Sequence, residues 1–200
     1  MKSNYSGILA GKKVALLMGG PGKERPVSLN SGAAVAKALR SIGADVHEID
    51  ISGPDFTLPE KTDLVFNIIH GTFGEDGALQ SILDGLGVPY TGEGELGSRL
   101  AFDKIASKRK FDEAGVPNAK WEILTGGKSI STPIPLVAKP PREGSSVGVH
   151  IVQKAEELPA ALEDCFSRDS EVLVEEFIRG RELTVGIVGG EALPVVEIVP

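Results

Sequence analysis

The sequence predicts an α/β fold followed by an α+β fold, with a parallel sheet in the first half of the chain and an antiparallel sheet in the second. Between residues 14 and 91, short apolar runs alternate with helical patterns, and strand–helix alternation with short connections is typical of a parallel sheet. After residue 115, β-type runs follow one another with a single helical pattern among them, at 155–165. This second pattern favours an antiparallel sheet that is covered on one side.

The composition is that of an ordinary globular protein, because 41% of the 200 residues are hydrophobic and 24% are charged. A net charge of −7 without a compensating Lys/Arg stripe argues against a nucleic-acid surface. The one cysteine, Cys165, allows neither an internal disulfide nor a thiolate metal cluster. The apolar patch at 7–11 is too short for a signal peptide, and no run has the length of a membrane span. We therefore expect a soluble, cytoplasmic protein.

The first half begins with a continuous apolar run at 14–18 that ends in a glycine turn, as a buried parallel strand does. We expect Ser28 to open the next helix as its N-cap and Gly43 to stop it. The further elements expected in this half are strands at 45–51, 64–69 and 88–91, and a helix capped by Asp76 that runs to residue 86.

Polar residues follow two of these strands. Glu24 and Arg25 come after the first strand, and His70 and Glu75 come after the third, among glycines. Ligands of parallel α/β sheets bind at the carboxyl ends of the strands, so we expect His70 and Glu75 to orient a polar substrate. We interpret Asp76 as a helix cap only.

The second half opens with a helical pattern at 96–114, and we place a domain boundary at its start, which gives domains 1–96 and 97–200. The basic run at 104–110 is interrupted by apolar residues, and we interpret most of it as a solvated helix face. The strands expected in this half lie at 121–124, 136–139, 147–152, 172–175, 182–188 and 192–199.

Residues 135–152 predict a β-hairpin with Lys139 at the mouth of its loop. Glycines let backbone N–H groups turn toward an anion, the hydroxyls of Ser145 and Ser146 add donors, and the lysine ammonium supplies a charge for phosphate. The alternative is a surface turn with an exposed lysine. This stretch by itself favours neither.

Two glutamates, Glu175 and Glu182, flank the end of a later strand. Carboxylates accept hydrogen bonds from amino groups and sugar hydroxyls, and the backbone between them can recognise a purine edge. The alternative is a pair of solvated glutamates on an edge strand.

Three glycine-containing stretches do not support a dinucleotide or P-loop site. The run at 19–22 lacks the dinucleotide spacing, and the GxGxxG match at 92–97 holds two glutamates that would repel a pyrophosphate. The run at 126–129 resembles the end of a P-loop, but position 122 is Glu where that motif requires Gly.

Four stretches together resemble the D-alanine–D-alanine ligase family of the ATP-grasp superfamily. They are GGPGKERPVSLNSG at 19–32, HGTFGEDGALQS at 70–81, KPPREGSSVGV at 139–149 and EEFIRGRE at 175–182. The resemblance spans nearly the whole chain. It implies a Rossmann-like pre-ATP-grasp domain followed by the antiparallel-sheet, nucleotide-binding part of an ATP-grasp fold. It also implies a ligase that phosphorylates one D-alanine with ATP, lets a second D-alanine displace the phosphate, and so supplies peptidoglycan synthesis.

The resemblance assigns the substrate residues by matching position. Glu24 is implied to hold the ammonium of the first D-alanine with Ser145 nearby. His70, oriented by Glu75, is implied to lie beside the reacting carboxylate.

The resemblance also assigns the ATP residues. Lys104 and Lys139 are implied to contact the phosphates, with Ser145, Ser146 and nearby N–H groups closing over them. The residues implied at the adenine are Glu175, Glu176, Phe177 and Ile178, and the residue implied at the ribose is Glu182.

The family continues beyond a chain of this length, and the resemblance places the ligands of Mg²⁺ (or Mn²⁺) after Pro200. We therefore expect these 200 residues by themselves to bind nucleotide weakly and not to turn over. Pro26 and Pro141 depart from the family pattern, and we expect them to reshape the first-substrate loop and to stiffen the entry to the lid.

Family members are usually homodimers. The alternatives are a ligase for D-lactate or D-serine, another ATP-grasp carboxylate–amine ligase, and a non-catalytic module that binds nucleotide or D-amino acid.

Overall fold

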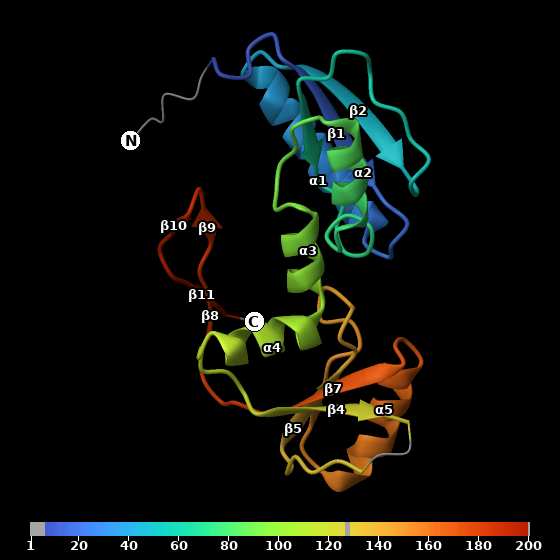
Figure 1. The fold of residues 1–200 in the computed structure, drawn as a ribbon, viewed down its shortest axis with the longest axis vertical. Helices are drawn as coiled ribbons and strands as arrows, with labels where there is room; N and C mark the ends of the chain where they lie inside the picture. Colours follow the sequence, from blue (N-terminus) through green and yellow to red (C-terminus); the bar gives the residue numbers. More distant parts are fainter. Residues whose placement is uncertain (1–6, 127–128, 200) are drawn as a thin grey trace.

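The computed structural model describes residues 7–126 and 129–199, so two residues of the 126–129 run lie outside the described part. The described chain forms two bodies, an upper one and a lower one, joined by two helices (Figure 1). Helix α3 (Glu95–Phe102) runs between the two bodies, and helix α4 (Lys104–Glu113) lies across the lower one.

The upper body is built on a parallel sheet, as predicted. Strand β1 (Lys13–Gly19) lies between β2 (Asp45–Ile51) and β3 (Leu64–Asn67), and both neighbours run parallel to it. The expected strand at 88–91 is reduced to one parallel bridge between Val65 and Tyr90.

Successive side chains of β1 point to opposite faces of the sheet, and each face is covered by a helix. Ala15 and Leu17 pack in one buried cluster with residues of α2 (Ala78–Leu86), whereas Val14 packs with Leu39 of α1 (Arg25–Ser41) on the other side. The carboxyl end of β1 and the segment after β3 thus lie at the edge of the sheet that faces the lower body.

The prediction that Ser28 opens the first helix is wrong. Helix α1 begins at Arg25, and Pro26 lies in its first turn. The missing N–H of a proline costs no hydrogen bond there, because the N–H groups of the first turn have no partner within the helix. Ser28 is fully buried, and its hydroxyl accepts from the Gly19 N–H (2.9 Å) and donates to the Ile68 carbonyl (2.7 Å). The serine therefore joins α1 to the ends of two strands instead of capping the helix.

The prediction of one helix over 96–114 is also wrong. The backbone at Asp103 is extended, which ends α3 and lets the Asp103 carboxylate accept hydrogen bonds from the N–H groups of Ile105 (2.9 Å) and Ala106 (3.0 Å). An aspartate in this position is a strong N-cap. The cap starts a new helix, α4, in a different direction (Figure 1).

The lower body contains a four-stranded antiparallel sheet in the order β4-β7-β5-β6, covered on one face by helix α5 (Leu158–Phe166), as predicted. A 3₁₀ turn at Ala155–Glu157 leads into α5. The side chains that pack under α5 include Leu136, Ala138 and Val174. The strands are β4 (Trp121–Thr125), β5 (Leu136–Lys139), β6 (His150–Val152) and β7 (Glu171–Glu176).

The last strands do not extend this sheet, contrary to the sequence prediction. They form two separate two-stranded ribbons, one from β8 (Glu182–Thr184) and β11 (Val196–Ile198), the other from β9 (Ile187–Val188) and β10 (Glu191–Ala192). Every residue from 178 to 199 is exposed, because neither a helix nor a further strand of the described chain covers the ribbons.

The two bodies have separate buried clusters, which lie on either side of the expected boundary at residue 96. That boundary falls within α3 and stays a prediction. Among the described residues, no helix has both the length and the apolar character needed to cross a membrane.

Candidate functional site

Three loops meet where the two bodies face each other. The first loop follows β1, the second follows β3, and the third connects β5 to β6. The hydroxyl of Ser145 in the third loop donates to Oε1 of Glu24 in the first loop, 121 residues away. A cavity of about 190 Å³ lies between them, and Gly71 and Gly144 line it together with Glu24. The structure therefore brings together the two residues expected at the first substrate.

His70 and Glu75 lie beside this cavity and line a neighbouring one of about 410 Å³. His70 Nδ1 is 3.7 Å from Glu75 Oε1, so the two side chains face each other at a distance longer than a hydrogen bond. Within the described residues, His70 Nε2 is buried without a hydrogen-bond partner. Asp76 accepts from the N–H groups of Phe73 (2.8 Å) and Ala78 (3.0 Å), and so holds the loop at the start of α2.

The loop between β5 and β6 is the predicted hairpin loop, because the two strands pair antiparallel. Ser145 and Ser146 both have positive φ, +48° and +58°. Non-glycine residues rarely adopt this backbone conformation, and it is found preferentially at ligand clamps and switch regions. Two successive residues of positive φ also form the type I′ turn of an ordinary β-hairpin, so the phosphate-binding loop stays a prediction.

Below this loop, a buried carboxylate contacts two lysines. Glu175 Oε2 pairs with Lys139 Nζ and Glu175 Oε1 pairs with Lys108 Nζ. Glu175 lies opposite Val137 in the sheet, so Lys139, two residues further along β5, is its diagonal neighbour on the same face. This face is the one opposite α5, and α4 supplies Lys108 to it.

The surroundings keep Glu175 ionised. Burial raises the pKa of this carboxyl, but the hydrogen bonds from Lys108 and Lys139 and their positive charges outweigh burial and lower the pKa below its usual value. Lys104 Nζ donates to the carbonyls of Glu143 and Pro141 in the hairpin loop. Burial lowers the pKa of Lys104, and the charge of Lys139 lowers it further.

Lys108 is an exception to the solvated helix face expected for most of the 104–110 run. Its side chain is only 11% exposed, and besides Glu175 it contacts Asn118 Oδ1 and the Ala119 carbonyl, each at 3.1 Å. Its spacing of four residues from Lys104 was the available signal, because residues i and i+4 share a helix face.

The segment expected at adenine and ribose lines an open cavity of about 770 Å³. Phe177, Ile178 and Glu182 all contribute to it. The N–H groups of Glu176 and Phe177 donate to the carbonyls of Lys120 (3.0 Å) and Pro135 (3.2 Å). These two N–H groups are thus already hydrogen-bonded within the protein.

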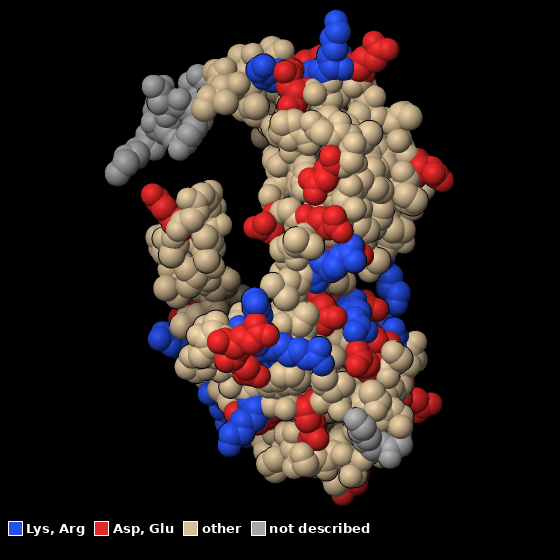
Figure 2. Space-filling model, in the orientation of Figure 1, with Lys and Arg blue, Asp and Glu red and all other residues tan. Residues whose placement is uncertain are grey.

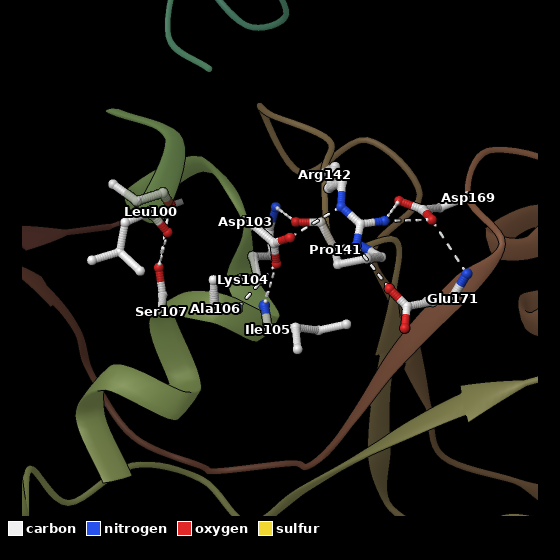
Figure 3. A network of polar contacts seen from close by, with 11 residues as sticks. Leu100, Asp103, Lys104, Ile105, Ala106, Ser107, Pro141, Arg142, Asp169 and Glu171 are labelled. Carbon is white, nitrogen blue, oxygen red and sulfur yellow. Dashed lines mark hydrogen bonds and ion pairs between the residues drawn. The ribbon is translucent and has the colours of Figure 1, made fainter. Parts of the chain in front are cut away.

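Sequence reasoning missed Arg142, which lies in the hairpin loop and contacts three carboxylates (Figure 3). Its Nε donates to Asp103 (3.0 Å), Nη1 to both oxygens of Asp169 (2.9 and 3.0 Å) and Nη2 to Glu171 (2.7 Å). Hydrogen bonding to Glu171, against the opposing effect of burial, raises the pKa of Arg142. Arg142 thereby ties the loop to the first turn of α4 and to β7.

Charges of both signs gather on the lower body and around its junction with the upper one, whereas the upper body shows fewer of them on this face (Figure 2). In the described part of the chain, no three His, Cys, Asp or Glu side chains are grouped to hold a metal ion.

Two family models match the chain. The model described as the D-ala D-ala ligase N-terminus matches residues 54–93, and the model described as the D-ala D-ala ligase C-terminus matches residues 111–200. Together they cover the loop after β3 and the whole lower body.

Curated relatives named D-alanine–D-alanine ligase are similar along almost the entire chain. The one from Citrifermentans bemidjiense is 49% identical over 196 residues, which are 94% of this chain and 63% of the relative. The one from Aquifex aeolicus is 45% identical over 194 residues, 94% of this chain and 67% of the relative. The chain thus spans just under two thirds of the first of these relatives.

Solved structures agree with the sequence comparisons. The D-alanine–D-alanine ligase of Bacillus anthracis has a TM-score of 0.84 at 32% identity, over 94% of this chain and 64% of that one. The D-alanyl-alanine synthetase A of Vibrio cholerae has a TM-score of 0.80 at 27% identity, over 95% of this chain and 67% of that one. The parallel sheet, the antiparallel sheet and the loops between them are those of an ATP-grasp ligase, and the chain belongs to the D-alanine–D-alanine ligase family.

Proposed function

We propose that this protein joins two D-alanines at the expense of ATP. A carboxylate oxygen of the first D-alanine attacks the γ-phosphorus of ATP, which yields D-alanyl phosphate and ADP. The amine of the second D-alanine then attacks the acyl carbon, phosphate leaves, and D-alanyl-D-alanine and a proton are the products. The observation that carries the proposal is the contact between Ser145 and Glu24, because it joins the expected substrate loop to the expected phosphate loop.

The first D-alanine fits the cavity of about 190 Å³. Its ammonium is proposed to bind the Glu24 carboxylate, with Ser145 holding that carboxylate in place. His70, oriented by Glu75, is proposed to face the substrate carboxylate from the adjoining cavity. The buried Nε2 of His70, which has no hydrogen-bond partner among the described residues, is the atom proposed to face that carboxylate.

ATP is proposed to bind along the lower body. Lys104 and Lys139 are assigned to the phosphates, with Ser145 and Ser146 closing over them. The assignments to adenine are Glu175, Glu176, Phe177 and Ile178, and the assignment to ribose is Glu182. Positioning and electrostatic stabilisation then carry the reaction without a protein nucleophile. A divalent cation, Mg²⁺ or Mn²⁺, is part of the proposal through the family alone.

The test is an assay of the full-length protein with ATP, Mg²⁺ and D-alanine. We expect phosphate release that depends on D-alanine, and D-alanyl-D-alanine as the product detected by mass spectrometry. D-lactate and D-serine serve as competing second substrates, although the names of the relatives do not favour them. The proposal would be refuted if ATP hydrolysis did not depend on D-alanine. It would also be refuted if the protein formed D-alanyl-D-lactate or D-alanyl-D-serine in preference to D-alanyl-D-alanine.

Gly71 provides a sharper test of the first-substrate cavity. Its φ is +68°, and a Cβ there would collide with Glu24 Oε2. We expect Gly71→Ala to raise the KM for D-alanine by about 10- to 100-fold, since the displaced carboxylate loses a charge-assisted hydrogen bond to the substrate. Steady-state kinetics at saturating ATP measures this.

Gly87→Ala is the matched control for Gly71→Ala. Gly87 has a similar φ of +66° at the end of α2, but a Cβ there meets no atom within 4 Å. It therefore introduces the same backbone strain away from the cavity. Equal effects of both substitutions on the KM for D-alanine would show that strain alone, and not the contact with Glu24, is responsible.

The compartment and the oligomeric state belong to the same proposal. A cytoplasmic location fits the use of ATP and the single buried cysteine, Cys165. A homodimer is proposed from the family resemblance, and light scattering measures it directly.

A further inference from the structure

We infer that Lys108 is a positioning residue for ATP, which keeps Glu175 neutralised so that Lys139 is free to move to the phosphates. The inference rests on the proposed nucleotide site and adds a residue that the site as assigned above does not contain. It starts from an ion-pair arrangement in which one buried carboxylate has two ammonium partners, one on each oxygen.

The two lysines and Glu175 are largely buried, so their ion pairs matter for stability. The side chains of Glu175, Lys108 and Lys139 are 8%, 11% and 20% exposed. A buried carboxylate that loses its partners carries a large desolvation cost. Lys139 is also the most exposed of the three and stands at the end of β5, where the hairpin loop begins.

The two lysines are held differently. Lys108 is anchored by the Asn118 side chain and the Ala119 carbonyl in addition to Glu175. The polar contact found for Lys139 within the described residues is the one to Glu175. Lys108 is therefore held in place by several contacts, whereas Lys139 needs to break only its contact with Glu175 in order to move.

Charge balance decides what happens when a nucleotide arrives. If Glu175 had Lys139 alone, moving that lysine to a phosphate would leave a buried anion close to an incoming polyanion. With Lys108 in place, Glu175 keeps a salt bridge and Lys139 can exchange a carboxylate for a phosphate. Lys108 thus acts on affinity for the phosphates without touching the nucleotide.

The experiment compares nucleotide binding by the full-length protein and its Lys108→Met variant, using ATP and adenosine as the two probes in titration calorimetry. We expect the variant to bind ATP about tenfold or more weakly, and adenosine within about twofold of the original protein, because adenosine has no phosphate for Lys139. Equal weakening for both probes would mean that Lys108 merely supports the local fold, and unchanged ATP binding would also overturn the inference.

Lys110→Met is the matched control. Lys110 lies on the same helix, two residues further on, and is paired at the surface with Glu113 at 2.8 Å, with 63% of its side chain exposed. We expect ATP and adenosine to bind this variant as they bind the original protein. A loss of ATP affinity equal to that of Lys108→Met would assign the effect to the general charge of α4 and overturn the inference.

A second pair of variants tests the mechanism even if Lys108→Met folds poorly. Glu175→Gln removes the charge that Lys108 balances but keeps an oxygen that can accept from an adenine amino group. On this background, adding Lys108→Met is expected to change ATP affinity by less than about threefold. A further tenfold loss in the double variant would show that Lys108 acts on something other than Glu175.

The outcomes separate this inference from the proposed function. If the original protein binds no ATP, the proposed function fails. If it binds ATP and the Lys108 variants behave like the original protein, only the positioning role of Lys108 fails.

Discussion

Lys139→Ala is expected to raise the KM for ATP by about 10- to 100-fold in the full-length protein, because a charge-assisted contact to phosphate is lost. The fold is expected to persist, since Glu175 keeps its contact with Lys108 after the substitution. The measurements are steady-state kinetics at varied ATP with D-alanine saturating, and thermal unfolding of the same samples.

Lys37→Ala is the control for Lys139→Ala, because Lys37 is exposed on α1, far along the chain from the hairpin loop. It removes the same charge and is expected to change neither the KM for ATP nor the unfolding temperature. If Lys139→Ala shows an unchanged ATP requirement, the hairpin loop is a surface turn and the phosphate assignment is wrong.

Arg142→Met is expected to lower both stability and catalytic efficiency. It leaves Asp103, Asp169 and Glu171 close together without the guanidinium that separates them. Because Arg142 is 45% exposed, solvent screens part of the loss, and we expect a decrease of about 1–2 kcal/mol in unfolding free energy. For a protein of this size that is a drop of about 2–8 °C in Tm.

The catalytic effect of Arg142→Met follows from the position of Asp103. Its carboxylate caps α4, and Lys104 occupies the first position of that helix, with its backbone N–H bonded to the Pro141 carbonyl (3.1 Å). A loosened cap displaces the Lys104 ammonium, and misplacement of about 1 Å costs up to about 100-fold in rate. We expect a fall of about tenfold in kcat/KM for ATP.

Two further variants make the Arg142 prediction specific. Arg142→Lys is expected to restore little, since one ammonium lacks the planar fork that bridges three carboxylates. Arg109→Met, at an exposed position of α4, is expected to change neither property. Full activity and stability of Arg142→Lys would show that a single charge suffices and that the bridging geometry is irrelevant.

The strands could be predicted from the sequence because their signals are local. The continuous apolar run of β1 predicts a strand buried on both faces. In β5, buried and partly exposed residues alternate along the strand, and Leu136 and Ala138 are the buried ones. The loops at the site were found for the same reason, since Glu24 and His70 lie in the loops that follow β1 and β3. The assignments of individual residues to substrate and ATP remain predictions.

The sequence predictions failed for side chains whose environment is set by segments far away along the chain. Ser28 resembles a cap, but its hydroxyl binds backbone groups of β1 and of the segment after β3. Lys108 resembles a surface lysine, and only the packing of α4 on the sheet brings it to Glu175 of β7. The contacts of Arg142 depend likewise on three separate parts of the chain, which periodicity cannot relate.

The break at Asp103 has a mechanical consequence. Because Arg142 fastens the start of α4 to the lower body, α4 and the cluster of Lys104, Lys108 and Lys139 form one rigid unit with the antiparallel sheet. We expect the extended backbone at Asp103, which separates α3 from α4, to act as the hinge when the upper body moves relative to the lower one. Such a motion would separate Ser145 from Glu24, whereas Lys104, Lys108 and Lys139 all lie on the lower side of the hinge. The amino acid site would then open without a change in the spacing of the three lysines.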